Sequence, residues 1–239
     1  MQDLPALTWY VGFRPGLRNQ ELGIPALAAR GVLITLEGVE GSGKSTQAER
    51  LAKRLAALGV PCLVSREPGG TAIGEAIRGV LLNPQHSEMY GLTELFLYLA
   101  ARNQLVRQKV LPAFAAGKVV ILDRFADSST AYQGAGRGLD LKLVARLNKL
   151  ATADLKPNLT VLVDVPVEVG QVRKGSGVLD RLERERVEFH ERVRQGYLQV
   201  ARRAPGRFKI VDGTLPADEL ERLVFRHVEE LLKRKVILK

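Results

Sequence analysis

Hydrophobic residues follow two alternating patterns along this 239-residue chain from residue 31 onward. Short runs rich in β-branched residues predict strands at 32–37, 61–65, 118–122, 159–164 and 208–211. Between these runs, apolar residues recur at spacings of three and four, which is the period of a helix with one buried face. Because strands that alternate with helices form a parallel sheet covered by helices, the pattern predicts a single α/β domain.

Two helical segments are clear near the C-terminus. In residues 218–235, Leu220, Val224, Val228 and Leu231 form an apolar stripe, with acidic residues in the first turn and basic residues in the last. Residues 180–201 carry a similar stripe, and their remaining positions are mostly charged. We expect both segments to be helices that dock through one face and expose the other.

The first 30 residues differ from the remainder of the chain. They contain three prolines and the only tryptophan, Trp9, and they show no sustained period. We therefore divide the chain into an N-terminal extension of unknown structure, residues 1–30, and one domain, residues 31–239.

Composition narrows the cellular setting. No window approaches the roughly 18 consecutive apolar residues of a membrane helix, and the N-terminus lacks a signal-peptide pattern. We expect a cytoplasmic protein with no membrane partner. Because the chain has one cysteine, Cys62, and three scattered histidines, it has no disulfide framework and no Cys/His zinc cluster. A bound metal is expected to depend on oxygen and phosphate ligands.

The formal net charge of +10 suggests an anionic partner. Residues 171–209 contain eleven Lys and Arg residues against five Asp and Glu residues, so much of the charge is concentrated there. Nucleic acid and polyphosphate nucleotides are both candidates. Aromatic residues make up only 5% of the chain and do not interleave with the basic residues, which argues against a single-strand binding surface.

A glycine-rich motif follows the first predicted strand. Gly38, Gly43, Lys44 and Ser45 have the spacing G-x-x-x-x-G-K-[ST] of a P-loop, and a helical pattern comes next. In such a loop, backbone N–H groups surround phosphate oxygens at the positive end of the helix. Lys44 is then placed to reach the β and γ phosphates and Ser45 to bind Mg²⁺; the alternative is a glycine-rich loop without a ligand. The predicted ATP-binding residues are Gly38, Val39, Glu40, Gly41, Ser42, Gly43, Lys44, Ser45 and Thr46.

A P-loop alone does not separate kinases from GTPases, partition ATPases or helicases. A GTPase switch requires an N/T-K-x-D motif that recognises guanine. The nearest match is residues 148–151, where Ala151 stands in place of the aspartate. This counts against the GTPase class.

An acid and a base follow the third predicted strand. Open α/β sheets bind ligands at the carboxyl edge, and Asp123 and Arg124 lie at that edge. Asp123 is placed to orient Mg²⁺ or its water, or to assist a phosphate nucleophile, and Arg124 to hold a second anion opposite the γ phosphate. The alternative is an ion pair at the strand end.

Three further groups are candidates for the acceptor side. Tyr98 and Arg102 are four residues apart in a helical pattern, so they project from one face and can meet a flat ligand by stacking and by forked hydrogen bonds; surface packing is the alternative. Residues 128–134 are polar and include Gln133, whose amide can both donate and accept; a hydroxyl-rich turn is the alternative. Residues 66–71 form a tight loop after the second strand.

Taken in order, these motifs resemble the thymidylate kinase family over essentially all of residues 31–235. The motifs are GVEGSGKST, REPGGT, YLAAR, DRFADSSTAYQG, PNLT before a strand ending LVDVP, and FHERVRQGYL. The resemblance implies an α/β fold of the P-loop NTPase type, with three layers and a five-stranded parallel sheet flanked by helices. It also implies a homodimer that transfers the γ-phosphate of ATP to dTMP to give dTDP, with Mg²⁺ as cofactor.

The resemblance also implies roles for single residues. Glu40 would approach the deoxyribose 3′-hydroxyl, Tyr98 would stack on thymine, Arg102 and Gln133 would bond its edge, and Arg124 would hold the acceptor phosphate. The implied dTMP-binding residues are Glu40, Arg66, Pro68, Tyr98, Arg102, Arg124, Ser129 and Gln133. The chain departs from the family pattern in having Tyr98 where Phe is frequent, Asn158 where PDLT is usual, and the N-terminal extension.

The source of the catalytic cations is a further inference from the resemblance. Eukaryotic relatives carry an arginine in the P-loop where this chain has Gly41, and bacterial relatives supply it from a lid, here about residues 171–184. Our hypothesis is that Arg173 or Arg181 reaches the transferred phosphate when the lid closes. The expected catalytic residues are Lys44, Asp123, Arg124, Arg173 and Arg181, with Ser45 and Asp123 at the metal; Arg186, Arg192 and Arg194 are expected on a solvated helix face.

Two other functions stay open at this point. The first is a kinase for another monophosphate, such as dUMP, dGMP or UMP, because the spacing of Arg102 and Gln133 suits uracil as well as thymine. The second is a P-loop ATPase that acts on DNA, which the positive charge would suit. We expect ATP and dTMP as the partners and no nucleic acid.

Overall fold

The computed structural model describes residues 31–175, 177 and 179–238. The predicted extension, residues 1–30, lies outside the described residues. The strands are β1 (Val32–Glu37), β2 (Cys62–Arg66), β3 (Val119–Asp123), β4 (Leu159–Asp164) and β5 (Phe208–Asp212). They form one five-stranded parallel sheet in the order β2-β3-β1-β4-β5. The predicted α/β fold is confirmed, and each predicted strand matches an observed one to within one residue at either end.

The helices connect these strands. They are α1 (Lys44–Ala57), α2 (Ala72–Leu82), α3 (Gly91–Leu105), α4 (Leu111–Ala115), α5 (Ala126–Ser129), α6 (Leu141–Ala151), α7 (Val167–Lys174), α8 (Val187–Arg203) and α9 (Ala217–Arg234), with wider π-type turns η2 (Val106–Val110) and η3 (Thr130–Gly136). None of the helices among the described residues is both long enough and apolar enough to span a membrane.

One predicted helix is shorter than its sequence pattern. The helical pattern of residues 180–201 becomes α8 only from Val187, and residues 181–185 form turns. Asp180 accepts hydrogen bonds from the backbone N–H groups of Leu182 and Glu183, and Arg186 is extended with ψ of 156°. These local bonds compete with a continuous helix, and the chain turns before α8 begins.

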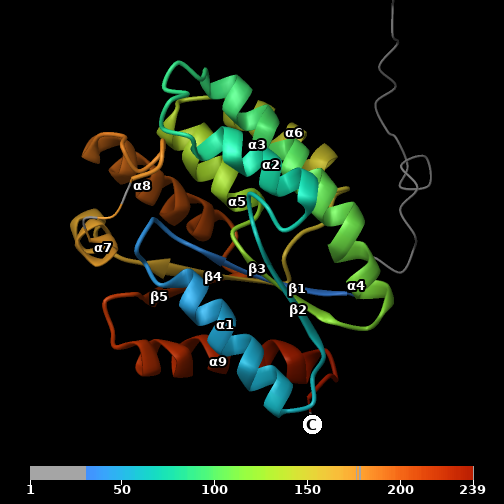
Figure 1. Ribbon diagram of the computed structural model, residues 1–239. Helices are drawn as coiled ribbons and strands as arrows, with labels where there is room; N and C mark the ends of the chain where they lie inside the picture. Colours follow the sequence, from blue (N-terminus) through green and yellow to red (C-terminus); the bar gives the residue numbers. More distant parts are fainter. Residues whose placement is uncertain (1–30, 176, 178, 239) are drawn as a thin grey trace, which may run out of the picture.

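Helices cover both faces of the sheet (Figure 1). One face packs against α1 and α9, and most of the other helices lie on the opposite face. Successive side chains of a strand point to opposite faces, so Val32, Ile34 and Leu36 of β1 join the α1 and α9 core while Leu33 joins the other core. Burial on both faces explains why the strand runs are almost continuously apolar.

The strand register brings three loops to one edge of the sheet. Asp123 at the end of β3 pairs in register with Leu36 of β1 on one side and with Arg66 of β2 on the other. The P-loop follows β1, the 66–71 loop follows β2, and Arg124 follows β3. The parallel topology therefore gathers at one edge the motifs that lie far apart in the sequence.

Candidate active site

A cavity of about 270 Å³ opens at this edge. It is bordered by the P-loop, the ends of β2 and β3, α2, α3, η3 and the predicted lid. Its lining residues are Glu40, Gly41, Lys44, Ser45, Arg66, Glu67, Pro68, Arg78, Leu82, Tyr98, Asp123, Arg124, Ser128, Tyr132, Gln133, Lys174, Asp180, Leu182 and Glu183. Six of the eight predicted dTMP-binding residues and four of the nine predicted ATP-binding residues therefore line one space.

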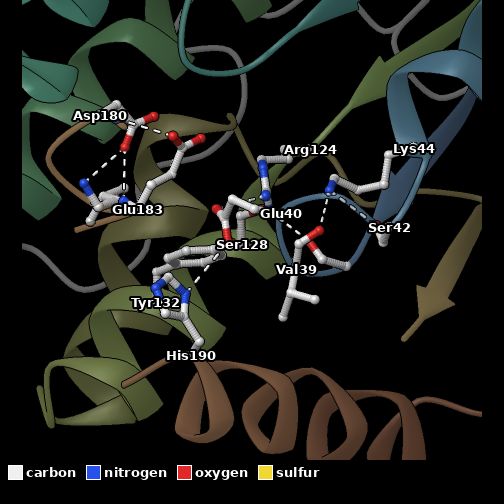
Figure 2. A network of polar contacts seen from close by, with 12 residues as sticks. Val39, Glu40, Ser42, Lys44, Arg124, Ser128, Tyr132, Asp180, Glu183 and His190 are labelled. Atoms are coloured by element: carbon white, nitrogen blue, oxygen red, sulfur yellow. Dashed lines mark hydrogen bonds and ion pairs between the residues drawn. The ribbon is translucent and has the colours of Figure 1, made fainter. Parts of the chain in front are cut away.

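The P-loop ends in a helix whose first N–H groups are not capped by a side chain. Gly43 adopts φ of 94°, and α1 begins at Lys44. The Lys44 ammonium donates to the Val39 carbonyl at 2.7 Å and to Ser42 Oγ at 3.2 Å (Figure 2). Burial, together with the nearby charge of Arg124, lowers the pKa of Lys44 to about 8 against the opposing effect of Asp123. An anion bound at the loop would supply a charged partner for the buried Lys44 ammonium.

The P-loop backbone also touches the lid helix directly. Gly41 has φ of 70°, and a Cβ built on it would lie 2.0 Å from the Gly170 carbonyl oxygen of α7. A Cβ on Gly170 would in turn lie 2.4 Å from the Glu40 carbonyl oxygen. The two backbones can approach each other so closely because both residues are glycine.

A hydroxyl and a carboxylate that line the cavity lie side by side. Ser45 Oγ donates to Asp123 Oδ2, and Asp123 Oδ1 is buried without a hydrogen-bond partner in the part of the chain that the structure describes. Hydroxyl and carboxylate oxygens are the donors that Mg²⁺ prefers. These two residues therefore fit the predicted metal, and the unpartnered oxygen is free for a ligand.

Arg124 connects the P-loop to α8 through its side chain. It has φ of 72°, an unfavourable conformation for a residue with a Cβ. One of its terminal nitrogens donates to the Gly38 carbonyl of the P-loop at 2.8 Å and to the Tyr197 hydroxyl at 2.8 Å. The other donates to Glu40 Oε1 at 3.1 Å. The surrounding contacts hold this strained residue across the cavity from Lys44.

Comparison with known proteins agrees with this arrangement. Residues 36–224 match the model of the family described as "Thymidylate kinase". The chain is similar to a thymidylate kinase of Carboxydothermus hydrogenoformans, 51% identical over 80% of this chain and 93% of that protein, and to one of Desulfosudis oleivorans, 50% identical over 79% and 92%. A crystal structure of thymidylate kinase from Ehrlichia chaffeensis superposes with a TM-score of 0.67 at 32% identity, covering 83% of this chain and 98% of that one.

The chain belongs to the thymidylate kinase family. The residues that the resemblance assigned to the acceptor now have positions in this family member. Tyr98, Gln133, Arg66 and Pro68 line the cavity beside Arg124, and Gln133 Nε2 donates to Glu94. The structure thus brings these side chains together, and their contacts with a nucleotide stay a prediction.

Two predicted acceptor residues do not line the cavity. The Arg102 guanidinium is fully buried, where it donates to Glu67 at 2.7 Å, to Ser129 at 2.8 Å, to Asn148 at 2.6 Å and to the Phe125 carbonyl at 3.1 Å. Four of its five N–H groups are therefore occupied. Ser129 is also buried and serves as one of these acceptors. The surface helix pattern around Arg102 did not reveal this buried network.

Glu40 is the acidic residue of the P-loop, and it forms an ion pair with Arg124. Its Oε1 accepts from the Tyr132 hydroxyl at 2.5 Å as well as from Arg124 (Figure 2). Burial by itself raises the pKa of Glu40, but Arg124, His190, Lys44 and Tyr132 together hold it well below its usual value. Glu40 is therefore an anion that can accept a further hydrogen bond.

The lid arginines point away from the cavity. Arg173 donates to the carbonyls of Gly213 at 2.6 Å and Thr214 at 3.2 Å. Arg181 is buried, donates to the Leu81 carbonyl and forms an ion pair with Glu94 at 2.7 Å. Neither arginine is among the lining residues, so in this arrangement neither reaches the space between Lys44 and Arg124.

Other lid residues do border the cavity. Lys174 forms an ion pair with Glu183, and Asp180 lies beside them (Figure 2). Of the arginines expected on the solvated face, Arg186 and Arg192 are exposed. Arg194 is half-buried and forms a bidentate ion pair with Asp164 at 2.8 and 2.9 Å, so for Arg194 the prediction is wrong.

Sequence reasoning missed several cavity residues. Tyr132 lies within the DRFADSSTAYQG motif, and Glu67 lies within REPGGT, so both could have been singled out from the motifs. Arg78 gave no such signal, because a lone arginine on a helix is normally solvated. His190 lies in the FHERVRQGYL motif, and its relation to Glu40 depends on the packing of α8.

Proposed function

We propose that the cavity holds ATP and dTMP end to end, with the P-loop around the donor phosphates and Arg124 on the acceptor phosphate. The reaction of this chain is the phosphorylation of dTMP by ATP, because relatives about 50% identical over nearly their whole length are thymidylate kinases. The proposal assigns that reaction to residues of the site.

One observation carries the assignment. Lys44 and Arg124 line the same cavity, and Arg124 donates to the carbonyl of Gly38, the first residue of the P-loop motif. A γ phosphate beside Lys44 and an acceptor phosphate on Arg124 would therefore be neighbours in one cavity. Such a reaction needs little covalent chemistry from the protein, and rate comes from holding the two phosphates in line and neutralising their charge.

The acceptor nucleoside is proposed to lie against α3 and η3. The Tyr98 ring can stack on the base, and Gln133 lies near enough to bond its edge. Arg102 does not line the cavity, and its proposed role is to hold Glu67 and Ser129 in place. Glu40 is proposed to accept from the 3′-hydroxyl of the sugar.

Mg²⁺ is the proposed cofactor, held by Ser45 and Asp123. The unpartnered Asp123 Oδ1 and the adjacent hydroxyl support this assignment. Among the described residues there is no group of three or more His, Cys, Asp or Glu side chains that could hold a metal ion. Phosphate oxygens and water would therefore complete its coordination, as is usual for Mg²⁺. When bound, the ion would neutralise charge on the phosphates during transfer.

Closure of the lid is proposed to deliver Arg173 or Arg181. Both now bond to carbonyls or to Glu94, so each must exchange these partners for phosphate oxygens. Charge-assisted bonds to phosphate are stronger than bonds to neutral carbonyls. Bound ATP and dTMP would therefore favour that exchange for Arg173.

A homodimer is also proposed. Four large apolar side chains are exposed on the adjacent helices α2 and α3, namely Ile73, Val80, Leu92 and Phe96. Exposed apolar patches of this kind mark interaction surfaces. Light scattering is expected to give twice the chain mass of 26.3 kDa, and a monomer at micromolar concentration would contradict the proposal. A cytoplasmic location stays a prediction.

An acceptor panel tests the proposed function most directly. The purified chain would be incubated with ATP, Mg²⁺ and one of dTMP, dUMP, UMP or dGMP, and diphosphate formation would be followed. We expect the highest kcat/KM with dTMP. A higher value with another monophosphate would overturn the proposed arrangement of the base site, and no transfer to any acceptor would overturn the proposed function.

A further inference from the structure

The two carboxylate oxygens of Glu40 differ in their hydrogen bonds. Oε1 accepts from Tyr132 and Arg124, whereas Oε2 is buried and has no hydrogen-bond partner among the residues that the structure describes. Nδ1 of His190 lies 3.6 Å from Oε2. Figure 2 shows the His190 ring directed from α8 toward Tyr132 and Glu40.

His190 is held firmly in this orientation. Its side chain is almost completely buried, and its ring makes an edge contact with Phe189, with the ring centroids 5.4 Å apart. In the neutral tautomer protonated at Nδ1, and in the imidazolium, an N–H group faces the Glu40 carboxylate. His190 therefore lies close enough to Glu40 to bond it after a small shift of the carboxylate.

A second cavity also borders Glu40 and His190. This cavity, of about 330 Å³, lies next to Glu40 and shares Glu40, Lys174 and Glu183 with the main cavity. His190 also lines it, and its Nε2 is buried and unpartnered within the described part of the chain. Glu40 thus borders both spaces. Tyr132 and Arg124, which hold Oε1, line the main cavity, and His190, which faces Oε2, lines the second. A contact of Oε2 with His190 would oppose rotation of the carboxylate away from Tyr132 and Arg124.

Helix α8 supports both members of the Glu40–Arg124 ion pair. His190 and Tyr197 are seven residues apart, two helical turns, and so lie on the same face. The Tyr197 hydroxyl accepts from Arg124 at 2.8 Å and donates to Glu37 at 3.0 Å. His190 thus faces the anion of the pair, and Tyr197 contacts the cation.

We propose that His190 is a positioning residue that orients the Glu40 carboxylate toward the 3′-hydroxyl of the acceptor nucleotide. The inference rests on the proposed function, in which Glu40 accepts from that hydroxyl. It adds a residue that contacts no substrate and acts through Glu40 alone. The consequence is specific: His190 affects binding of an acceptor that has a 3′-hydroxyl and does not affect one that lacks it.

The test combines variants of His190 with two acceptors, dTMP and 3′-deoxythymidine monophosphate. His190→Leu removes both ring nitrogens at similar volume. His190→Asn places an amide N–H near the position of Nδ1. We expect His190→Leu to raise KM for dTMP about tenfold with little change in kcat, as for loss of a bond to a charged group. KM for the 3′-deoxy acceptor should not change, and His190→Asn should retain most of the affinity of the wild type for dTMP.

Tyr197→Phe is the matched control on the same helix face. It removes a hydroxyl that contacts Arg124, which is proposed to hold the acceptor phosphate that both nucleotides share. Tyr197→Phe is therefore expected to impair the two acceptors equally. The ratio of KM values for the two acceptors separates His190 from Tyr197.

Several outcomes would overturn the proposal. If His190→Leu impairs both acceptors equally while its unfolding temperature is normal, His190 only fills space. If the wild type does not distinguish the two acceptors yet phosphorylates both, Glu40 does not bind the 3′-hydroxyl, and the inference fails while the proposed function stands. If the wild type phosphorylates neither, the proposed function itself fails. Should His190→Leu not fold, His190→Phe preserves the ring contact with Phe189, removes both nitrogens and serves the same comparison.

Discussion

The P-loop and the lid are both glycine-containing segments that the sequence predicts to contact phosphate. In the structure, their predicted catalytic cations differ in whether they line the cavity. The P-loop lies where its motif predicts, with Lys44 facing the cavity. The two lid arginines are bonded elsewhere, Arg173 to the Gly213 and Thr214 carbonyls and Arg181 to Glu94. A P-loop binds phosphate through its own backbone N–H groups, so the local sequence is sufficient to predict its position. A long side chain can find several partners, and its position depends on the whole fold.

The largest expected effect comes from the lid. The double substitution Arg173→Ala and Arg181→Ala is expected to lower kcat by about 10³ or more, because a cation that stabilises the transferred phosphate contributes that much. KM for dTMP should change little, since neither arginine lines the cavity in this arrangement. Steady-state kinetics with ATP and dTMP measures both constants.

The matched control is Arg192→Ala on α8, an exposed arginine that donates to the Gly136 carbonyl. Its kcat should equal that of the wild type. Unchanged turnover in the double variant would show that the lid arginines take no part in the mechanism. The P-loop and the lid would then differ in function as well as in geometry.

The next effect concerns the place where the two regions touch. Gly41→Ala puts a Cβ 2.0 Å from the Gly170 oxygen at a residue with φ of 70°. We expect the free energy of unfolding to fall by about 2–3 kcal/mol, since strain of this kind costs about 1–3 kcal/mol and the steric clash adds to it. The unfolding temperature should fall by about 5–10 °C for a domain of this size. Thermal unfolding without nucleotide measures the change.

Gly43→Ala separates backbone strain from the clash. Gly43 has φ of 94°, and a Cβ on it would have no neighbour within 4 Å. The alanine there should cost only the backbone part, about 1–2 kcal/mol. Equal losses in the two variants would mean that α7 moves away from the P-loop at no cost, and the contact between loop and lid would be unimportant for stability.

The last effect, on the pH dependence of stability, concerns Glu37, the buried acid at the end of β1. Burial, with the charge of Asp127, raises the pKa of Glu37 from 4.5 to about 7. The folded state therefore binds more protons than the unfolded state between pH 4.5 and 7, so stability should decrease as pH rises through that window. Glu37→Gln removes this titration and should flatten the dependence. Urea unfolding at pH 5 and pH 7.5 measures it.

The Glu37 result also bears on the anchor of the acceptor loop. Glu37 accepts from the backbone N–H of Phe125 at 2.8 Å, from Ser128 at 2.6 Å and from Tyr197 at 3.0 Å. Glutamine can keep the bond to Phe125, and the two hydroxyls can rotate to accept from its amide. A pH dependence as steep as that of the wild type would show that other buried acids, such as Glu67, dominate this window.

Much of the fold was predictable because its signals are local. Each strand pattern in the sequence matched an observed strand. The signal is strongest for β1, β3 and β4, because strands buried on both faces are apolar along nearly their whole length. The start of α8 was not predictable from periodicity. There, the carboxylate of Asp180 binds the backbone at Leu182 and Glu183, which favours a turn over the helix that the spacing of apolar residues suggested.

The candidate site was predictable in part for the same reason. Asp123 and Arg124 were identified because they directly follow a predicted strand, and the end of a parallel strand lies at the carboxyl edge of the sheet. Arg102 and Arg194 were not interpreted fully, because a charged residue on a helix face is normally solvated, and each is instead bonded to a distant acid, Glu67 and Asp164. Nothing in the spacing of residues reveals such a partner.

By itself, the sequence determined the layered α/β architecture, the phosphate loop from Gly38 to Ser45 and the family to which the chain belongs. These depend on main-chain geometry and on short-range spacing, which neighbouring residues fix. Only the tertiary structure decided which side chains meet: that Glu40 lies between Arg124 and His190, and that Arg173 and Arg181 are occupied away from the cavity. Such contacts join residues far apart in the chain, and packing of helices on the sheet determines them.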